Sequence, residues 1–334
     1  MFDYRWSIKD GYPARGVEKH NTTVMTTFSC GGGSSMGYKL AGYDVVCAND
    51  IDPQMQKVYE ANHHPKQYIL APIKDLLSRD DLPQVDVLDG SPPCSTFSTA
   101  GLREKAWGKE KMFREGQARQ VLDDLFFDFI KLAEKMQPKI VIAENVSGML
   151  KGNAKGYVKL IVSEFERIGY KVQVFLLNAA SMGVPQKRQR VFFICHKTDK
   201  TIKLDFNEEP IKLKDIFLGD GMLLKGREKL LWDNRRLTDN DLGKINLRLY
   251  GKETSFTTKL LHKNQTPKTL IASDNNIHYD IPRKISNKEA ALIGSFPEDY
   301  EYLDIQPKYL IGMSVPPVMM ANVAYQVYKQ LIDV

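Results

Sequence analysis

Cysteine is scarce in this sequence and is not arranged in pairs. The four cysteines, at positions 30, 47, 94 and 195, show no CxxC spacing, which argues against a disulfide framework and predicts no metal site. No apolar run approaches the ~18 residues of a membrane-spanning helix. The first ten residues carry charges in place of the apolar core of a secretory signal. We therefore expect a cytoplasmic protein with reduced thiols and no membrane association.

The sequence also lacks a large excess of either positive or negative charge. Lys and Arg number 47 against 41 Asp and Glu, so the formal net charge is +6 over 334 residues. This balance is compatible with a polyanionic partner but does not by itself indicate one. With 43% hydrophobic residues the chain can bury a sizeable core. Its length predicts one large domain with a smaller one, or two of similar size.

Short apolar runs alternate with helical patterns through the first 196 residues. Such alternation is typical of an α/β fold with a doubly wound, mostly parallel sheet, of the Rossmann-like kind. The expected strands are 24–28, 44–48, 85–88, 139–143, 171–177 and 191–195. The expected helices are 54–62, 122–136, 157–168, 287–293 and 317–332.

The character of the sequence changes at residue 197. Residues 197–282 carry scattered Lys, Asn and Thr with few long apolar runs, which predicts a second, smaller domain of mixed structure. Residues 283–334 contain two expected helices and are predicted to return to the first domain, residues 23–196. Residues 1–22 are polar, with glycine and proline, and indicate an N-terminal extension that packs loosely or pairs with a partner.

A glycine-rich turn follows the first expected strand. Glycines at 31, 32, 33 and 37 let a backbone approach a ligand closely and open a helix whose N-terminus faces it. Asp50 follows the second strand about twenty residues on, where dinucleotide-type folds place an acid on ribose hydroxyls. The turn does not match GxGxxG, so both a nucleoside-cofactor site and a purely structural turn remain open.

Three further polar segments lie beside other expected strands. Residues 89–95 and Glu144 follow strands, at the ends where sheets of this kind bind their ligands, whereas residues 186–190 precede the strand at 191–195. Two prolines stiffen the segment 89–95 and would present Cys94 as an exposed thiol, although a cysteine in a loop can equally be inert. Glu144 directly follows the strand at 139–143 and is either a proton donor with a raised pKa or an ordinary loop acid. Arg188 and Arg190 share a strand face and either bind an anion or base edge together or form a solvated basic turn.

The order and spacing of these segments resemble the DNA (cytosine-5)-methyltransferase family from about Thr26 to Leu331. Phe28 to Gly37 resembles the family's methyl-donor motif, and Arg283 to Pro297 resembles the motif that follows its recognition domain. The other matching segments are Ser91-Pro92-Pro93-Cys94 with Phe97-Ser98, Glu144-Asn145-Val146, Gln186-x-Arg188-x-Arg190 and Tyr309-x-x-Gly312-x-Ser314-Val315-Pro316.

The resemblance implies covalent catalysis on cytosine. The Cys94 thiolate would add to carbon 6 of the base and build carbanion character at carbon 5. Glu144 would hydrogen-bond or protonate ring nitrogen 3, and Arg190, supported by Arg188, would hold the base carbonyl. The target base would have to flip out of the duplex. Residues 96–120 resemble the mobile loop that closes over it.

The resemblance also implies a methyl donor and partners. The donor would be S-adenosylmethionine, leaving S-adenosylhomocysteine, and residues 23–196 would form the catalytic methyltransferase domain. Residues 197–282 would be the target recognition domain, entering the major groove of double-stranded DNA. We expect a monomer, with a cognate restriction endonuclease as a further partner in a restriction-modification system. The cofactor-binding residues would be Phe28, Gly31, Gly32, Gly33, Asp50, Ile51, Ile73, Pro92, Leu125 and Ser314.

Three rival interpretations differ in substrate or in class. A tRNA methyltransferase of the same superfamily keeps the chemistry, but the separate segment of about 85 residues favours DNA. An amino-methyltransferase shares Ser-Pro-Pro, yet Cys94 stands where a stacking aromatic residue would be needed. A non-catalytic DNA-binding relative would be expected to have lost Cys94, Glu144 or Arg190, and all three are present.

Overall fold

The large lobe is built on a seven-stranded sheet with strand order β3-β2-β1-β4-β7-β9-β8. The computed structural model describes residues 2–93, 110–111, 120–121, 125–151, 154–252, 258–272 and 276–333. The strands of this sheet are β1 (Thr23–Thr27), β2 (Asp44–Asp50), β3 (Gln67–Leu70), β4 (Val87–Gly90), β7 (Ile140–Val146), β8 (Lys171–Asn178) and β9 (Gln189–His196).

The strand directions confirm the predicted sheet. Strands β3, β2, β1, β4 and β7 pair in parallel, and β9 pairs antiparallel with both β7 and β8. Strand β9 is thus the one reversed member of this sheet, inserted between two strands that run the same way. Strand β3 was not predicted, because it is a four-residue edge strand with a single buried residue, Ile69.

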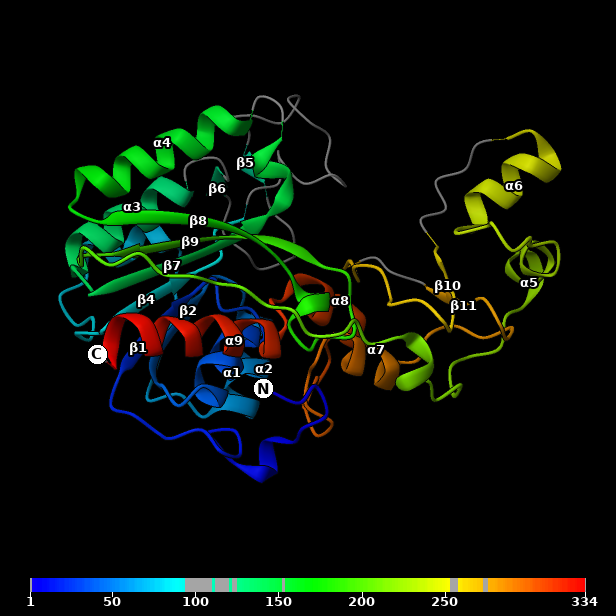
Figure 1. Cartoon of the computed structure of the whole chain (residues 1–334), viewed down its shortest axis with the longest axis horizontal. Coiled ribbons are helices and arrows are strands. Elements are labelled where there is room, and N and C mark those ends of the chain that lie inside the picture. Colours follow the sequence, from blue (N-terminus) through cyan, green and yellow to red (C-terminus); the bar gives the residue numbers. More distant parts are fainter. Residues whose placement is uncertain are drawn as a thin grey trace.

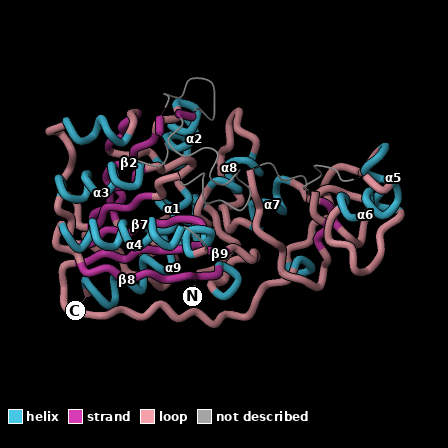
Figure 2. Tube along the Cα trace, turned by 90° about the horizontal axis from the view of Figure 1, so that it is seen from above, coloured by secondary structure: helices cyan, strands magenta, loops and turns pink. Residues whose placement is uncertain are grey.

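Helices cover both faces of the sheet (Figures 1 and 2). Helices α3 and α4 pack over one face, and α1 and α9 over the other. Glycine permits the close α1–α9 contact, since a Cβ at Gly37 would lie 2.5 Å from the Met320 Cβ. The helices of the large lobe are α1 (Gly33–Leu40), α2 (Pro53–His63), α3 (Leu125–Met136), α4 (Ala154–Arg167), α7 (Asn287–Ile293), α8 (Pro307–Met313) and α9 (Pro317–Val327), followed by a π-helical turn at Tyr328–Ile332.

The C-terminal helices form an apolar stretch that the sequence did not reveal as one run. Within the described residues, Pro307–Ile332 is the one helical stretch long and apolar enough to cross a membrane. The stretch is interrupted, because Ser314, Val315 and Pro316 separate α8 from α9. Since 83% of its apolar window is buried inside the protein, the stretch packs as a core element.

The N-terminal extension is firmly packed, so the expectation of loose packing is wrong. Phe2 is buried in the core shared by α1 and α9. The Trp6 indole donates to the Ser295 carbonyl at 2.9 Å. The Asp299 carboxylate accepts hydrogen bonds from the Ser7 hydroxyl at 2.8 Å and from the Ile8 amide at 2.7 Å. These long-range contacts attach the extension to the C-terminal part of the chain.

A second, smaller lobe lies beyond the end of the sheet (Figures 1 and 2). It contains α5 (Gly226–Asp233), α6 (Leu242–Tyr250), β10 (Leu260–Leu261) and β11 (Ile277–His278). Its core is separate from those of the large lobe and is formed by Leu224, Leu231, Trp232, Leu242, Ile245, Leu260 and Ile277. Residues 202–216 precede it and still pack on the large lobe, through Ile202, Leu204, Leu213 and Ile216.

Glu289 on α7 joins the chain entering the small lobe to the chain leaving it. Its buried carboxylate accepts from the Leu218 and Gly219 amides at 3.0 and 3.1 Å, and from the His278 ring at 3.0 Å. It also accepts from the Ser286 amide, closing a capping box at the start of α7. Burial raises the pKa of Glu289, but these hydrogen bonds outweigh burial and hold it at about 2. The Glu289 carboxylate is therefore ionised, and both of its oxygens accept hydrogen bonds.

Replacing Glu289 with Ala is expected to lower the free energy of unfolding by roughly 3–5 kcal/mol, because it leaves buried donors without their acceptor. Glu298→Ala, which removes an exposed carboxylate nearby, is the matched control and should change it by less than about 0.5 kcal/mol. Denaturant unfolding of both variants measures the difference. Equal stabilities would show that the junction does not depend on this carboxylate.

Candidate active site

The carboxyl ends of β1, β2, β4 and β7 meet at one edge of the sheet. Because these strands are parallel, the segments that follow them must lie together there. The segments are the glycine turn after β1, Asp50 at the end of β2, Ser91 to Pro93 after β4, and Glu144 near the end of β7. The structure thus brings the predicted motifs together at the edge expected for a ligand site.

Asp50 is hydrogen-bonded to the glycine turn and to the two residues that follow Asp50 itself. Its carboxylate accepts from the Cys30 amide at 2.8 Å, the Ile51 amide at 2.7 Å and the Asp52 amide at 3.0 Å. Burial raises the pKa of Asp50, and the three amides oppose that rise. The turn itself is sharply wound, with φ of 52° at Phe28 and 47° at Cys30. The Asp50 carboxylate is thus fixed by hydrogen bonds next to a turn whose backbone has positive φ at two non-glycine residues.

The glycines of the turn are required by contacts within the protein. A Cβ at Gly32 would lie 2.0 Å from the His63 Nε2, and one at Gly33 would lie 2.2 Å from the Val315 carbonyl oxygen. A Cβ at Gly31 would lie 2.7 Å from Leu310. Each Cβ direction is filled by α2 or by the α8–α9 region, so only the main chain of the turn remains to face a ligand.

The other cofactor candidates fall into two groups. Ile73 and Leu125, the first residue of α3, are buried in the same core, whereas Phe28 and Ile51 are half-buried. Ser314 is buried against the turn, with its hydroxyl 4.0 Å from the Cys30 sulfur. The C-terminal motif therefore returns to the glycine turn, 284 residues away along the chain.

Glu144 and Arg190 form a buried ion pair across β7 and β9. The Arg190 Nε lies 2.8 Å from the Glu144 Oε1, and their side chains are 14% and 9% exposed. Arg190 pairs with Val146 in the antiparallel register, which places it two positions from Glu144 on the same face. Burial lowers the pKa of Arg190, and the charge of Glu144 opposes that shift. The pair fixes a carboxyl group and a guanidinium near the carboxyl end of β7.

Asn145 anchors the segment that leads to Cys94. Its side-chain amide donates to the Pro92 carbonyl at 2.9 Å, while its side-chain oxygen accepts from the Val146 amide at 2.8 Å. Cys94 itself lies outside the described residues. Most of the expected closing loop at 96–120 also lies outside the described residues. The exceptions are two short strands, β5 (Glu110–Lys111) and β6 (Gln120–Val121), and Val121 lies just beyond the expected loop.

Arg188 is bound entirely by main-chain oxygens. Its guanidinium donates to the Leu270 carbonyl at 3.0 Å, the Gly312 carbonyl at 3.0 Å and the Ser314 carbonyl at 2.9 Å. Burial lowers the pKa of Arg188, and neighbouring Arg190 lowers it further. This side chain ties the end of the small lobe to α8, and it does not share the position of Arg190 beside Glu144.

Asp89, the first residue of the 89–95 segment, is an acidic neighbour of Glu144 for which the sequence predicted no role of its own. It is 2% exposed on β4 and accepts from the Tyr38 hydroxyl at 3.1 Å. Burial raises its pKa to about 8, and the charge of Glu144 adds to that rise. The available signal was a carboxyl group in an apolar strand, because a buried acid seldom lies there without a specific partner.

The raised pKa of Asp89 predicts a pH-dependent stability. Native Asp89 stays protonated up to about pH 8, whereas the unfolded chain loses this proton near the ordinary value of 3.8. Between these values the native state holds the extra proton, so its stability should fall as pH rises, by up to about 1.4 kcal/mol per pH unit. Asp89→Asn should remove this contribution. Parallel unfolding curves of the two proteins from pH 5 to 8 would contradict it.

Comparison with known proteins agrees with this geometry. The model of the C-5 cytosine-specific DNA methylase family matches residues 22–329. The chain is 29% identical to the type II methyltransferase M.FnuDI of Fusobacterium nucleatum, covering 93% of this chain and 95% of that one. It is 28% identical to M.NgoPII of Neisseria gonorrhoeae, covering 91% and 93%. A solved structure of a Spodoptera frugiperda DNMT2 mutant superposes with a TM-score of 0.64 at 17% identity, covering 92% and 100%.

The sheet order, with one reversed strand next to the edge, defines an S-adenosylmethionine-dependent methyltransferase fold. Within that class, the chain belongs to the C-5 cytosine-specific DNA methylase family, whose model spans nearly its whole length. It is a DNA (cytosine-5)-methyltransferase, and the curated relatives that it matches are type II methyltransferases of restriction-modification systems.

Proposed function

We propose that this enzyme methylates carbon 5 of a flipped-out cytosine in double-stranded DNA through a covalent bond from Cys94 to carbon 6. The thiolate attack moves electron density to carbon 5, which then takes the methyl group. Loss of the carbon 5 proton to a base expels the Cys94 thiolate and restores the aromatic ring. The observation that carries the proposal is the buried Glu144–Arg190 pair beside the Asn145–Pro92 anchor.

Glu144 and Arg190 have complementary parts in this reaction. Glu144 holds ring nitrogen 3 and draws off negative charge as the thiolate adds, while Arg190 orients Glu144 and holds the base carbonyl. Arg188 acts as a positioning residue, because its guanidinium binds three main-chain carbonyls. Asn145 holds Pro92, and with it the stem of the loop that carries Cys94.

The turn fits S-adenosylmethionine through its donors and acceptors. Asp50 uses three amide hydrogen bonds, and since a carboxylate has about four lone-pair positions it can still accept from a ribose hydroxyl. Half-buried Phe28 and Ile51 would pack against the donor, with the main chain of Gly31, Gly32 and Gly33 facing it. Ile73, Pro92, Leu125 and Ser314 would support these contacts from behind. When bound, the donor supplies an electrophilic methyl group and leaves as S-adenosylhomocysteine.

The proposed domain boundaries differ from the two lobes at residues 202–216, which pack on the large lobe. Residues 23–196 would form the catalytic domain and 197–282 the target recognition domain, with 1–22 and 283–334 completing the large lobe. The separate core around Trp232 supports an independent recognition element. The enzyme would act as a monomer in the cytoplasm, paired with a restriction endonuclease that cuts the same unmodified site.

Transfer of tritium from labelled S-adenosylmethionine tests the substrate. Duplex DNA and tRNA are supplied in parallel, and the product is hydrolysed to nucleosides. Label recovered as 5-methylcytosine from DNA alone is the expected result. Label in tRNA alone would keep the chemistry and overturn the substrate, and label in neither would favour a non-catalytic DNA-binding relative.

A further inference from the structure

The connection between α5 and α6 exposes an apolar side chain at its tip. We call residues 236–240 the α5–α6 turn. Leu237 is 84% exposed, the highest value among the large hydrophobic side chains described, and Arg236 and Thr238 beside it are also exposed. A leucine this exposed contributes little to the core, so its side chain is available for contact with a partner. Asp239, two residues on, is buried.

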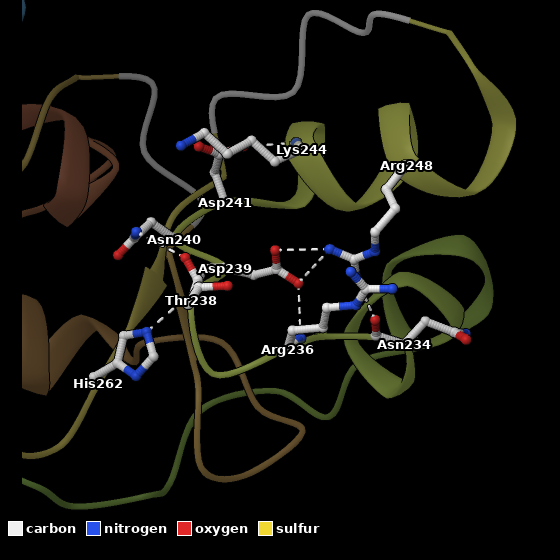
Figure 3. A network of polar contacts seen from close by, with 9 residues as sticks. All are labelled: Asn234, Arg236, Thr238, Asp239, Asn240, Asp241, Lys244, Arg248 and His262. Carbon is white, nitrogen blue, oxygen red and sulfur yellow. Dashed lines mark hydrogen bonds and ion pairs between the residues drawn. The ribbon is translucent and has the colours of Figure 1, made fainter.

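Buried Asp239 braces this turn from behind (Figure 3). Its carboxylate accepts from the Arg236 amide at 2.7 Å and from the Arg248 Nη1 at 2.8 and 2.9 Å. The second Arg248 nitrogen, Nη2, donates to the Asn234 carbonyl at 2.6 Å. The Asp239 carbonyl lies 3.2 Å from the His262 Nε2. These contacts join the turn to α6, to the end of α5 and to the strand segment after β10.

The brace is charged as well as buried. Burial raises the pKa of Asp239, but the hydrogen bonds from Arg248 and from the Arg236 amide outweigh burial and keep that pKa below its ordinary value. The Asp239–Arg248 ion pair therefore stabilises the conformation of the turn. Ordering it in advance reduces the conformational entropy that a partner would otherwise have to remove on binding.

The surroundings of the turn suit a polyanion. Basic residues outnumber acidic ones between positions 225 and 252. Phosphate groups bind such surfaces, whereas base edges are read by Arg, Thr and Asn, and thymine methyl groups by apolar side chains. Within the turn, Arg236, Thr238 and Asn240 are the residue types that read base edges, and Leu237 is the type that contacts thymine methyl groups. An uncharged protein partner would not explain this combination of residue types.

We propose that the α5–α6 turn contacts the bases of duplex DNA and helps to set which sequence is methylated. Leu237 and its polar neighbours make the contacts, and the Asp239–Arg248 pair is the positioning element that holds them. The inference rests on the proposed assignment of residues 197–282 as the recognition domain. It goes further by naming the segment of that domain that reads sequence.

Leu237→Ser tests the contact without disturbing the fold, because the side chain is almost fully exposed. The KM for duplex DNA should rise about tenfold or more, with altered preference among sites in a random-sequence duplex mapped for 5-methylcytosine. The KM for S-adenosylmethionine and the thermal midpoint should stay unchanged. Leu247→Ser, on α6 and 44% exposed, is the matched control and should leave all four quantities as in the wild type.

Arg248→Met tests the brace. Loss of the ion pair should broaden the set of methylated sites and raise the KM for DNA, while Arg248→Lys should partly restore both. A purely structural role would lower the thermal midpoint and leave site preference unchanged. If the wild type methylates DNA but Leu237→Ser has an unaltered KM for DNA and an unaltered site preference, the inference is overturned. Absence of DNA methylation by the wild type would instead overturn the proposed function.

Discussion

Cys94→Ser is expected to lower the rate of methyl transfer to DNA by about 10⁴-fold or more, because catalysis that depends on one nucleophile collapses without it. The described cysteines are poor substitutes. Burial raises the pKa of the Cys30 thiol to about 12 and that of Cys47 to about 12, and raises the pKa of Cys195 strongly. Thiols of this kind are almost entirely protonated at neutral pH, so they are not available as nucleophiles.

Cys195→Ala is the matched control for that experiment. Cys195 is buried in β9, so the substitution should cost about 1 kcal/mol of stability and leave kcat near the wild-type value. Denaturing gel analysis adds a second readout, since a trapped DNA adduct on a mechanism-based cytosine analogue requires the nucleophilic sulfur. Adduct formation by Cys94→Ser, or loss of it in Cys195→Ala, would contradict the assignment of Cys94.

The alternation of strands and helices could be predicted because local patterns determine it. Buried strands such as β7 read as continuous apolar runs, and α7 begins at Asn287 as expected, since the Ser286–Glu289 capping box is visible in the sequence. The reversed direction of β9 could not be predicted. It depends on which neighbours β9 joins, and the residues of a buried strand look alike in either direction.

The motifs predicted which segments lie together at the carboxyl ends of the strands, but local chemistry did not distinguish the contacts that their members make. Arg188 and Arg190 lie two residues apart, yet one binds three main-chain carbonyls and the other pairs with Glu144. The two arginines differ because Arg188 lies next to Leu270 and α8, whose carbonyls it binds, and both are distant from it in sequence. The glycines of the turn show the same limit, because the atoms that exclude a Cβ there come from His63 and Val315.

Glu144→Gln is expected to lower kcat for DNA methylation by about 10²- to 10⁴-fold, with little change in the KM for S-adenosylmethionine. Gln keeps the shape of the side chain and a contact to Arg190 but cannot donate a proton or balance the guanidinium charge. The loss should therefore appear in the chemical step, measured by single-turnover transfer from labelled donor.

Three measurements separate this effect from misfolding. Glu166→Gln makes the same change at an exposed position on α4 and should leave kcat unaltered. Glu144→Gln should still bind duplex DNA, because the recognition lobe does not contain it. Since Arg190 would then be a buried charge with a neutral partner, the variant should also lose stability, and Arg190→Met in the same protein should restore part of that loss. A single-turnover rate within about threefold of the wild type would show that Glu144 does not assist the attack of Cys94.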